Sequence, residues 1–228
     1  MITVFPPSPQ PVVPVAGTAA VFPVRRIFCV GQNYAAHARE MGSDPTRTEP
    51  MFFTKPGDAV VASGDTVPYA AQTSNLHYEI ELVAAMASGG ANIPVEAALG
   101  HVFGYAAGID LTRRDLQAAA KKAGQPWDMA KGFDRSAPIG TIAPARAIGH
   151  PAAGGIRLSV NGAARQSSDL SDMIWSVAQI IARLSQFVEL RAGDLIFTGT
   201  PEGVGPIQRG DLLEGAIDGV GTVTVTVA

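Results

Sequence analysis

Cysteine is almost absent from this sequence, because Cys29 is the single cysteine among 228 residues. One thiol excludes an internal disulfide framework and a thiolate metal cluster, and favours a reducing cytoplasm. Charge is also scarce, since 16% of the residues are charged and the net charge is −3. Without a run of Lys and Arg, the chain lacks the positive surface that binds nucleic acids or anionic membranes. No apolar run is long enough to cross a bilayer. These absences favour a soluble, cytoplasmic enzyme.

The first 24 residues contain six prolines and no basic residue. A targeting segment needs a positive start followed by an unbroken apolar stretch, and this segment has neither. We therefore expect residues 1–24 to be an extended lead-in with a short edge strand near Val12–Val15. The remaining range, 25–228, is long enough for one catalytic domain with a sizeable core.

Short strands separated by turns dominate the pattern, consistent with 25 glycines and 17 prolines. Asn161-Gly162 between two alternating segments predicts a tight hairpin. Asn33 is expected to cap a helix over Tyr34–Met41. Thr112, with Asp115 three residues later, predicts the start of a second helix that ends before Gly124. With few helices and many strands, the chain is expected to be an α+β protein rich in β structure.

Three acidic residues suggest a metal site. Glu79 and Glu81 lie two residues apart on an apolar, alternating segment, so both carboxylates project from one side of a strand. Asp110 follows a later strand, Val102–Ile109, and would complete an all-oxygen site for a hard divalent ion. A solvated strand face with incidental acids explains the same spacing equally well.

Six sequence blocks occur in order along the chain: Val30–His37, Phe53–Pro56, Asn75–Leu82, Asp110–Asp115, Ala130–Asp134 and Thr198–Gly205. Together they resemble the fumarylacetoacetate hydrolase family, and most closely its bacterial acylpyruvate hydrolases, such as the fumarylpyruvate hydrolases of gentisate breakdown. The resemblance implies a mixed β-roll or barrel with peripheral helices, a homodimer, and a Mg²⁺ or Mn²⁺ ion in each subunit. It makes Glu79, Glu81 and Asp110 the metal ligands.

The resemblance also assigns catalytic roles. His37 and Glu40 stand three residues apart on the first predicted helix and would activate water, since a carboxylate raises the basicity of an imidazole. An ordinary surface pair is the alternative. Lys131 would lie beside the metal and hold a substrate oxygen or a developing enolate, whereas a solvated lysine is the alternative.

Residues that would bind the substrate are less sharply defined. The loop Thr198–Gly205 would present the Thr200 hydroxyl and backbone N–H groups, including that of Gly199, to a carboxylate. Gln117 is a further candidate, although helix packing explains it equally well. Tyr105 and Lys55 are similarly ambiguous.

The expected reaction is hydrolysis of the C3–C4 bond of a 2,4-dioxo acid, with fumarylpyruvate as the leading substrate. Oxaloacetate decarboxylation or isomerisation of an oxo-diacid on the same fold is the first alternative. A metal- or metabolite-binding protein without turnover is the second. A fumaryl substrate has a distal carboxylate that needs a cation, and the sequence does not choose among five arginines: Arg25, Arg26, Arg39, Arg113 and Arg114.

Overall fold

The computed structural model describes residues 3–42, 44 and 49–228. Its centre is an eight-stranded sheet in the order β4-β3-β15-β8-β9-β11-β5, with β12 paired to β9. Most neighbouring strands are antiparallel, whereas β15 pairs with β3, and β11 with β5, in parallel. The strands are β3 (Arg26–Gly31), β4 (Met51–Lys55), β5 (Val60–Ala62), β8 (Ile80–Met86), β9 (Val102–Ile109), β11 (Ala137–Ile139), β12 (Ala143–Pro144) and β15 (Asp194–Phe197).

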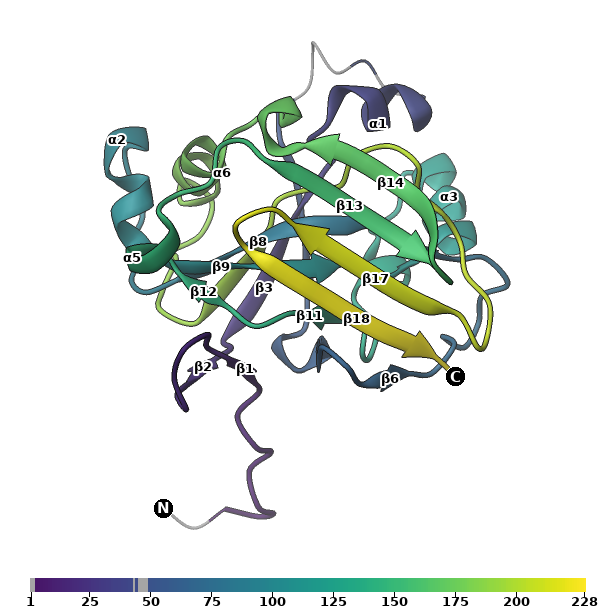
Figure 1. The fold of residues 1–228 in the computed structure, drawn as a ribbon, viewed down its shortest axis with the longest axis horizontal. Coiled ribbons are helices and arrows are strands. Elements are labelled where there is room, and N and C mark those ends of the chain that lie inside the picture. Colours follow the sequence, from purple (N-terminus) through teal and green to yellow (C-terminus); the bar gives the residue numbers. More distant parts are fainter. Residues whose placement is uncertain (1–2, 43, 45–48) are drawn as a thin grey trace.

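A second, five-stranded sheet in the order β14-β13-β17-β18-β6 lies in front of the first in Figure 1. The predicted Asn161-Gly162 hairpin is confirmed, since it joins two antiparallel strands of this sheet. Both residues have positive φ, 53° and 77°, as a tight turn of that kind requires. The strands are β6 (Thr66–Val67), β13 (Gly155–Val160), β14 (Ala163–Asp169), β17 (Leu212–Ile217) and β18 (Gly221–Val227).

The main core fills the space between these two sheets. Strand β8 shows that the central sheet has a core on each of its two faces. Every residue of β8 is buried. Leu82, Ala84 and Met86 belong to the core between the sheets, while Val83 and Ala85 belong to a second core on the opposite face. A strand buried on both faces has a continuous apolar sequence, which is why only its first residues alternate visibly.

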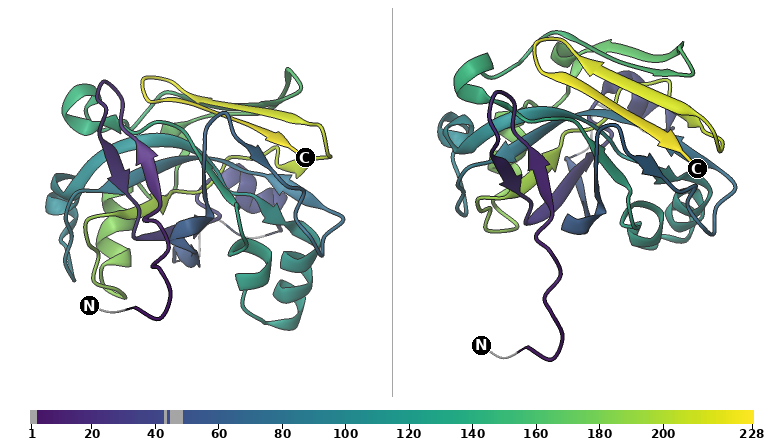
Figure 2. Two further views of the ribbon diagram at one scale, coloured as in Figure 1. Left: turned by 90° about the horizontal axis from the view of Figure 1, so that it is seen from below. Right: turned by 60° about the horizontal axis from the view of Figure 1, so that its bottom comes forward.

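The lead-in forms a two-stranded hairpin, β1 (Val12–Pro14) with β2 (Val21–Pro23). Val13 and Phe22 point into the second core, so the hairpin covers that face of the central sheet. Before it the chain extends away from the body of the molecule (Figure 2), with the Phe5 side chain exposed. The predicted edge strand is therefore present.

Helices lie around the periphery of the sheets (Figure 1). The predicted β-rich α+β architecture with peripheral helices is confirmed. Among the described residues, no helix has both the length and the apolarity that crossing a membrane requires. The helices are α1 (Ala35–Glu40), α2 (Val95–Ala98), α3 (Arg114–Ala123), α4 (Asp128–Lys131), α5 (Ala145–Ile148) and α6 (Val177–Leu184).

Two predicted helix caps are wrong, for a common reason. The Asn33 side chain does not cap α1; it bonds Trp175 and the Thr198 carbonyl oxygen, on loops distant in sequence. The Thr112 hydroxyl donates to the Asp110 carbonyl oxygen instead of capping α3. The Thr112 oxygen also accepts a hydrogen bond from Lys131 Nζ. Both residues thus have partners at the buried site, where tertiary contacts compete with the helix end. The α3 stop is correct, because Gly124 adopts a left-handed conformation with φ 64°.

Candidate functional site

Glu79, Glu81 and Asp110 come together at the junction of three short segments. Glu79 separates β7 (Leu76–Tyr78) from β8, which carries Glu81, and Asp110 follows β9. Antiparallel pairing of β8 with β9 places Glu81 opposite Gly108 and Ile80 opposite Ile109, which brings Asp110 beside both glutamates. One carboxylate oxygen from each acid lies within 4.8 Å of the others. All three are at most 5% exposed, so the alternative of a solvated strand face is excluded.

Cations surround two of the three acids. Lys131 Nζ lies 2.8 Å from Glu79 Oε2 and 2.6 Å from Asp110 Oδ2, and Arg114 pairs with Glu79 Oε1. Burial alone would raise the pKa of Glu79, but Lys131 and Arg114 outweigh it and hold that pKa below its usual range. Glu79 is therefore ionised in the fold.

Lys55 lies beneath Asp110, with its Nζ 2.8 Å from Oδ1. Its ammonium also donates hydrogen bonds to the Leu111 and Lys131 carbonyl oxygens. Asp110 Oδ1 is thus a buried oxygen whose partner is the Lys55 ammonium group. A buried, charge-paired carboxylate is an oxygen donor of the kind that a hard divalent ion binds.

Glu81 has no ion pair among the described residues and accepts one hydrogen bond, from the Gly199 N–H at 2.8 Å. Burial, together with the nearby charges of Asp110 and Glu79, raises its pKa well above the usual value. A divalent ion among the three carboxylates would supply the positive charge that Glu81 lacks. Oxygen donors without a nearby thiolate match Mg²⁺ or Mn²⁺ better than zinc. The three acids are thus able to bind a divalent metal ion.

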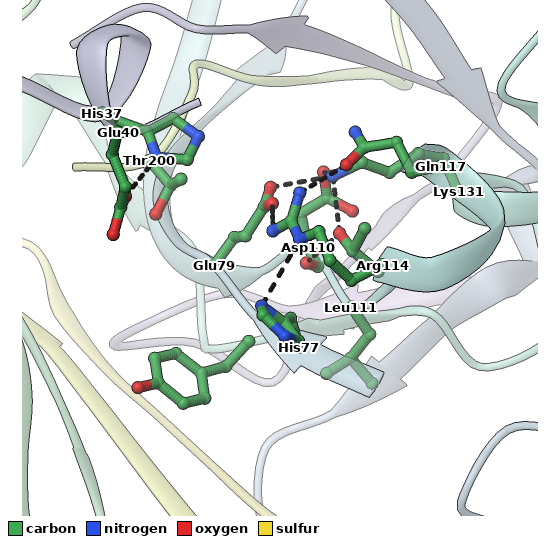
Figure 3. A network of polar contacts seen from close by, with 12 residues as sticks. His37, Glu40, His77, Glu79, Asp110, Leu111, Arg114, Gln117, Lys131 and Thr200 are labelled. Atoms are coloured by element: carbon green, nitrogen blue, oxygen red, sulfur yellow. Dashed lines mark hydrogen bonds and ion pairs between the residues drawn. The ribbon is translucent and has the colours of Figure 1, made fainter. Parts of the chain in front are cut away.

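His37 and Glu40 form a pair on α1, with His37 Nδ1 2.9 Å from Glu40 Oε2. The imidazole is 4% exposed, and the Gly203 N–H donates to the other Glu40 oxygen at 3.3 Å. Figure 3 shows the ring on the side of Glu40 that faces Thr200 and Glu79. The histidine therefore shares the space in front of the acidic triad, as an ordinary surface pair would not.

Lys131 lies beside the triad as predicted, but its ammonium is fully used by the protein. Besides the two carboxylates, Nζ donates to the Thr112 hydroxyl at 2.6 Å. Burial would lower its pKa, yet Asp110 and Glu79 raise it, so the side chain is charged. A substrate oxygen would have to replace one of these partners to bind Lys131 directly.

The loop after β15 contributes Thr200, which is 2% exposed. Its hydroxyl oxygen accepts a hydrogen bond from Gln166 Nε2 at 2.8 Å. Gly199, predicted to bind substrate, instead gives its N–H to Glu81 and so supports a proposed metal ligand. Gln117 accepts a hydrogen bond from Arg114 at the base of α3.

One cavity of about 520 Å³ is lined by most of these groups, whereas Asp110 and Gly199 do not line it. Of the five candidate arginines, only Arg114 lines it; Arg25 and Arg26 pair with Asp194 outside it. Tyr105 is buried elsewhere, with its hydroxyl 2.7 Å from His150. The lining comprises His37, Glu79, Glu81, Lys131, Thr200, Arg114 and Gln117, and, not foreseen from the sequence, Val30, Gly31, Gln32, Met41, Phe53, Ala118, Lys121, Lys122 and Trp127.

The family model described as fumarylacetoacetate (FAA) hydrolase C-terminal matches residues 26–228. A mitochondrial oxaloacetate tautomerase of Mus musculus is 44% identical over 196 residues, covering 86% of this chain and 88% of that protein. A fumarylpyruvate hydrolase of Ralstonia sp is 42% identical over 184 residues, covering 81% and 95%.

Among solved structures, the fumarylpyruvate hydrolase of Pseudomonas aeruginosa, in complex with Mn²⁺ and pyruvate, has a TM-score of 0.98 against this chain. The two sequences are 54% identical, and the match covers 100% of this chain and 99% of the other.

Proposed function

The chain belongs to the fumarylacetoacetate hydrolase family, and from this membership we propose that it is a metal-dependent acylpyruvate hydrolase that converts fumarylpyruvate and water into fumarate and pyruvate. The observation that carries the proposal is that His37, paired with Glu40, lines the same cavity as Glu79 and Glu81 of the acidic triad. Binding an oxo acid needs only the triad, whereas hydrolysis also needs a base for water.

Glu79, Glu81 and Asp110 would hold Mg²⁺ or Mn²⁺, which when bound supplies Lewis-acid charge to the oxygens of an oxo acid. The fit rests on three buried carboxylates that bring one oxygen each within 4.8 Å of the others, and on Glu81, which has no ion pair among the described residues. Lys131 and Arg114 keep the set from becoming too negative to accept an anionic substrate.

His37 acts as the general base in this proposal. With Nδ1 held by Glu40, the Nε2 atom is left to take a proton from water. The resulting hydroxide attacks C4 of the dioxo acid, and the C3–C4 bond breaks. The hydroxyl group ends in the fumarate carboxyl group, and the proton returns from His37 to C3 to complete the pyruvate methyl group. Glu40 stabilises the imidazolium between these steps.

We expect Thr200 to donate a hydrogen bond to the substrate. Because its oxygen already accepts from Gln166, its own O–H is free to point elsewhere, and the side chain lines the cavity. An oxygen that gains negative charge during the reaction is a suitable acceptor. Lys131 contributes its positive charge from beside the triad, where it pairs with Glu79 and Asp110.

The test is direct. Purified protein with Mg²⁺ or Mn²⁺ is incubated with fumarylpyruvate, and pyruvate is followed by a coupled lactate dehydrogenase assay. We expect turnover, and His37→Ala to lower kcat about 10²- to 10⁴-fold through loss of the base. His101→Ala is the matched control, since His101 bonds Ser88 away from the cavity. No pyruvate from the unaltered protein, or an unchanged kcat in His37→Ala, would overturn the proposal.

Oxaloacetate chemistry is the second candidate, because the mouse relative is an oxaloacetate tautomerase at 44% identity. Tautomerisation moves a proton without adding water, and the same His37 could carry it. Measuring enol loss and pyruvate release from oxaloacetate, beside pyruvate release from fumarylpyruvate at equal concentration, separates the tautomerase, decarboxylase and hydrolase activities. A higher kcat/KM for oxaloacetate would favour this second candidate.

A further inference from the structure

The sequence contains only four lysines, and all of them belong to the region of this one site. Lys55 and Lys131 are buried against the acidic triad. Lys121 and Lys122 are exposed and line the same cavity, in the last turn of α3. The first two neutralise carboxylates of the protein. The second two have no acid partner among the described residues.

Helix α3 determines how far these two lysines lie from the triad. Arg114, Gln117 and Lys121 follow one another at spacings of three and four, so they share one helix face, which borders the cavity. Arg114 contacts Glu79 at one end of the helix. Seven residues further on, about 10 Å along the axis at 1.5 Å per residue, Lys121 stands at the opposite end.

Lys121 Nζ donates one hydrogen bond, to the Met41 carbonyl oxygen at 3.1 Å, just after α1. An ammonium group has three N–H donors, so two remain. The bond fixes the side chain at the wall between α3 and the end of α1. A positioned ammonium with spare donors suits a carboxylate.

Aromatic side chains form part of the same lining. Phe53 and Trp127 pack together with ring centroids 6.0 Å apart, and both border the cavity. The cavity therefore offers charged groups beside Glu79 at one end of α3, the Lys121 and Lys122 ammonium groups at the other end, and aromatic side chains in its wall. A ligand that matches these features has two anionic ends separated by a short hydrocarbon segment.

We propose that Lys121, assisted by Lys122, binds the distal carboxylate of a dicarboxylic acylpyruvate, which rests on the proposed hydrolase function. A seven-carbon diacid in extended form is long enough to reach from the triad to Lys121. A four-carbon diacid such as oxaloacetate is too short for both contacts. This subsite selects acyl groups that end in a carboxylate.

The kinetic test compares fumarylpyruvate with acetylpyruvate, which has the same reacting atoms and a methyl group at the distal end. In Lys121→Met, kcat/KM for fumarylpyruvate divided by kcat/KM for acetylpyruvate is expected to fall about tenfold. The fall comes mainly from a higher KM for fumarylpyruvate. Lys121→Arg should restore much of the ratio, and Lys121→Met/Lys122→Met should lower it further. Arg146→Met, an exposed cation of α5 outside the cavity, is the control. An equal loss on both substrates would assign Lys121 a merely structural role and overturn the subsite.

A binding measurement makes the subsite testable without turnover. Calorimetry in the presence of Mg²⁺ compares a seven-carbon 2-oxo diacid with the 2-oxo monoacid of equal length. Preference for the diacid in the unaltered protein, lost in Lys121→Met, supports the subsite even if fumarylpyruvate is not hydrolysed. Equal affinity for the two acids overturns it even if hydrolysis is observed.

Discussion

Gln166 connects two parts of the site that are distant in sequence. Its Oε1 accepts from the Ile80 N–H, between the two glutamates, at 3.0 Å. Its Nε2 donates to the Thr200 hydroxyl and to the Pro201 carbonyl oxygen, each at 2.8 Å. This buried side chain of β14 therefore fixes the strand that carries two proposed metal ligands against the loop that carries Thr200. It acts through its neighbours, as a positioning residue.

Replacing Gln166 by Met keeps the volume and removes the hydrogen bonds. We expect the free energy of unfolding to fall by about 1–3 kcal/mol, because the Ile80 N–H would remain buried without an acceptor. Urea denaturation measures the change. Activity should fall through kcat as well, since Thr200 and Glu79 lose their fixed spacing. Gln186→Met, on the exposed surface, is the control. A stability equal to that of the unaltered protein would contradict this role.

The elements of the site are short, and their ends carry the chemistry. The acids lie at the ends of β7 and β9 and at the start of β8, and Lys131 ends α4. The loop after β15 can approach them closely because Gly199 has φ +97° and no side chain. A Cβ at Gly199 would stand 2.7 Å from Asn33 Cβ and 3.1 Å from the Val30 carbonyl oxygen.

Gly199→Ala is therefore expected to destabilise the protein and to displace the N–H that holds Glu81. Gly210→Ala is the matched control, since Gly210 has φ +89° and open space around it. Backbone strain alone costs about 1–2 kcal/mol in either variant. The clash adds about 1–3 kcal/mol at Gly199. Thermal denaturation and metal titration should thus show a larger loss of stability and weaker Mg²⁺ binding in Gly199→Ala alone. Equal losses in both variants would exclude the proposed clash.

At the scale of the whole molecule, the acidic triad couples metal binding to stability. The three carboxylates come from segments at the junction of the central sheet, so an ion bound to all three stabilises their native arrangement. A ligand at a hundred times its Kd adds about 2.7 kcal/mol to the free energy of unfolding.

The predicted homodimer and the cytoplasmic location remain predictions, and sedimentation equilibrium would test the former.

Removing the metal should lower Tm, and Mg²⁺ or Mn²⁺ should restore it. In the metal-free protein the pKa of Glu81 is raised by burial and by Asp110 and Glu79. A group whose pKa is raised on folding contributes stability at low pH that is lost as the pH rises through the folded-state pKa. Glu81→Gln should therefore be at least as stable as the metal-free protein at neutral pH, and should lose the response of Tm to Mg²⁺. A chelator that leaves Tm unchanged, or a Glu81→Gln variant that still responds fully to Mg²⁺, would contradict this coupling.

Elements whose cause is local could be predicted from the sequence alone. Alternation around Glu79 and Glu81 placed both acids on one face, and three-residue spacing joined His37 to Glu40. The Asn161-Gly162 turn and the Gly124 stop follow from backbone conformation at single residues. The ordered blocks identified the family because several such local patterns occur together.

The partner of each buried polar group, in contrast, depends on how distant segments pack together. Asn33 bonds loops distant in sequence and Thr112 accepts from Lys131 instead of capping helices, and Gly199 supports Glu81. Neither the bond that the Ile80 N–H donates to Gln166 nor the position of Lys121 at the cavity has a local signal. Hydrogen-bonding groups buried at a junction of several strands bond to whichever partners the packing brings within reach, and sequence distance carries no information about those partners.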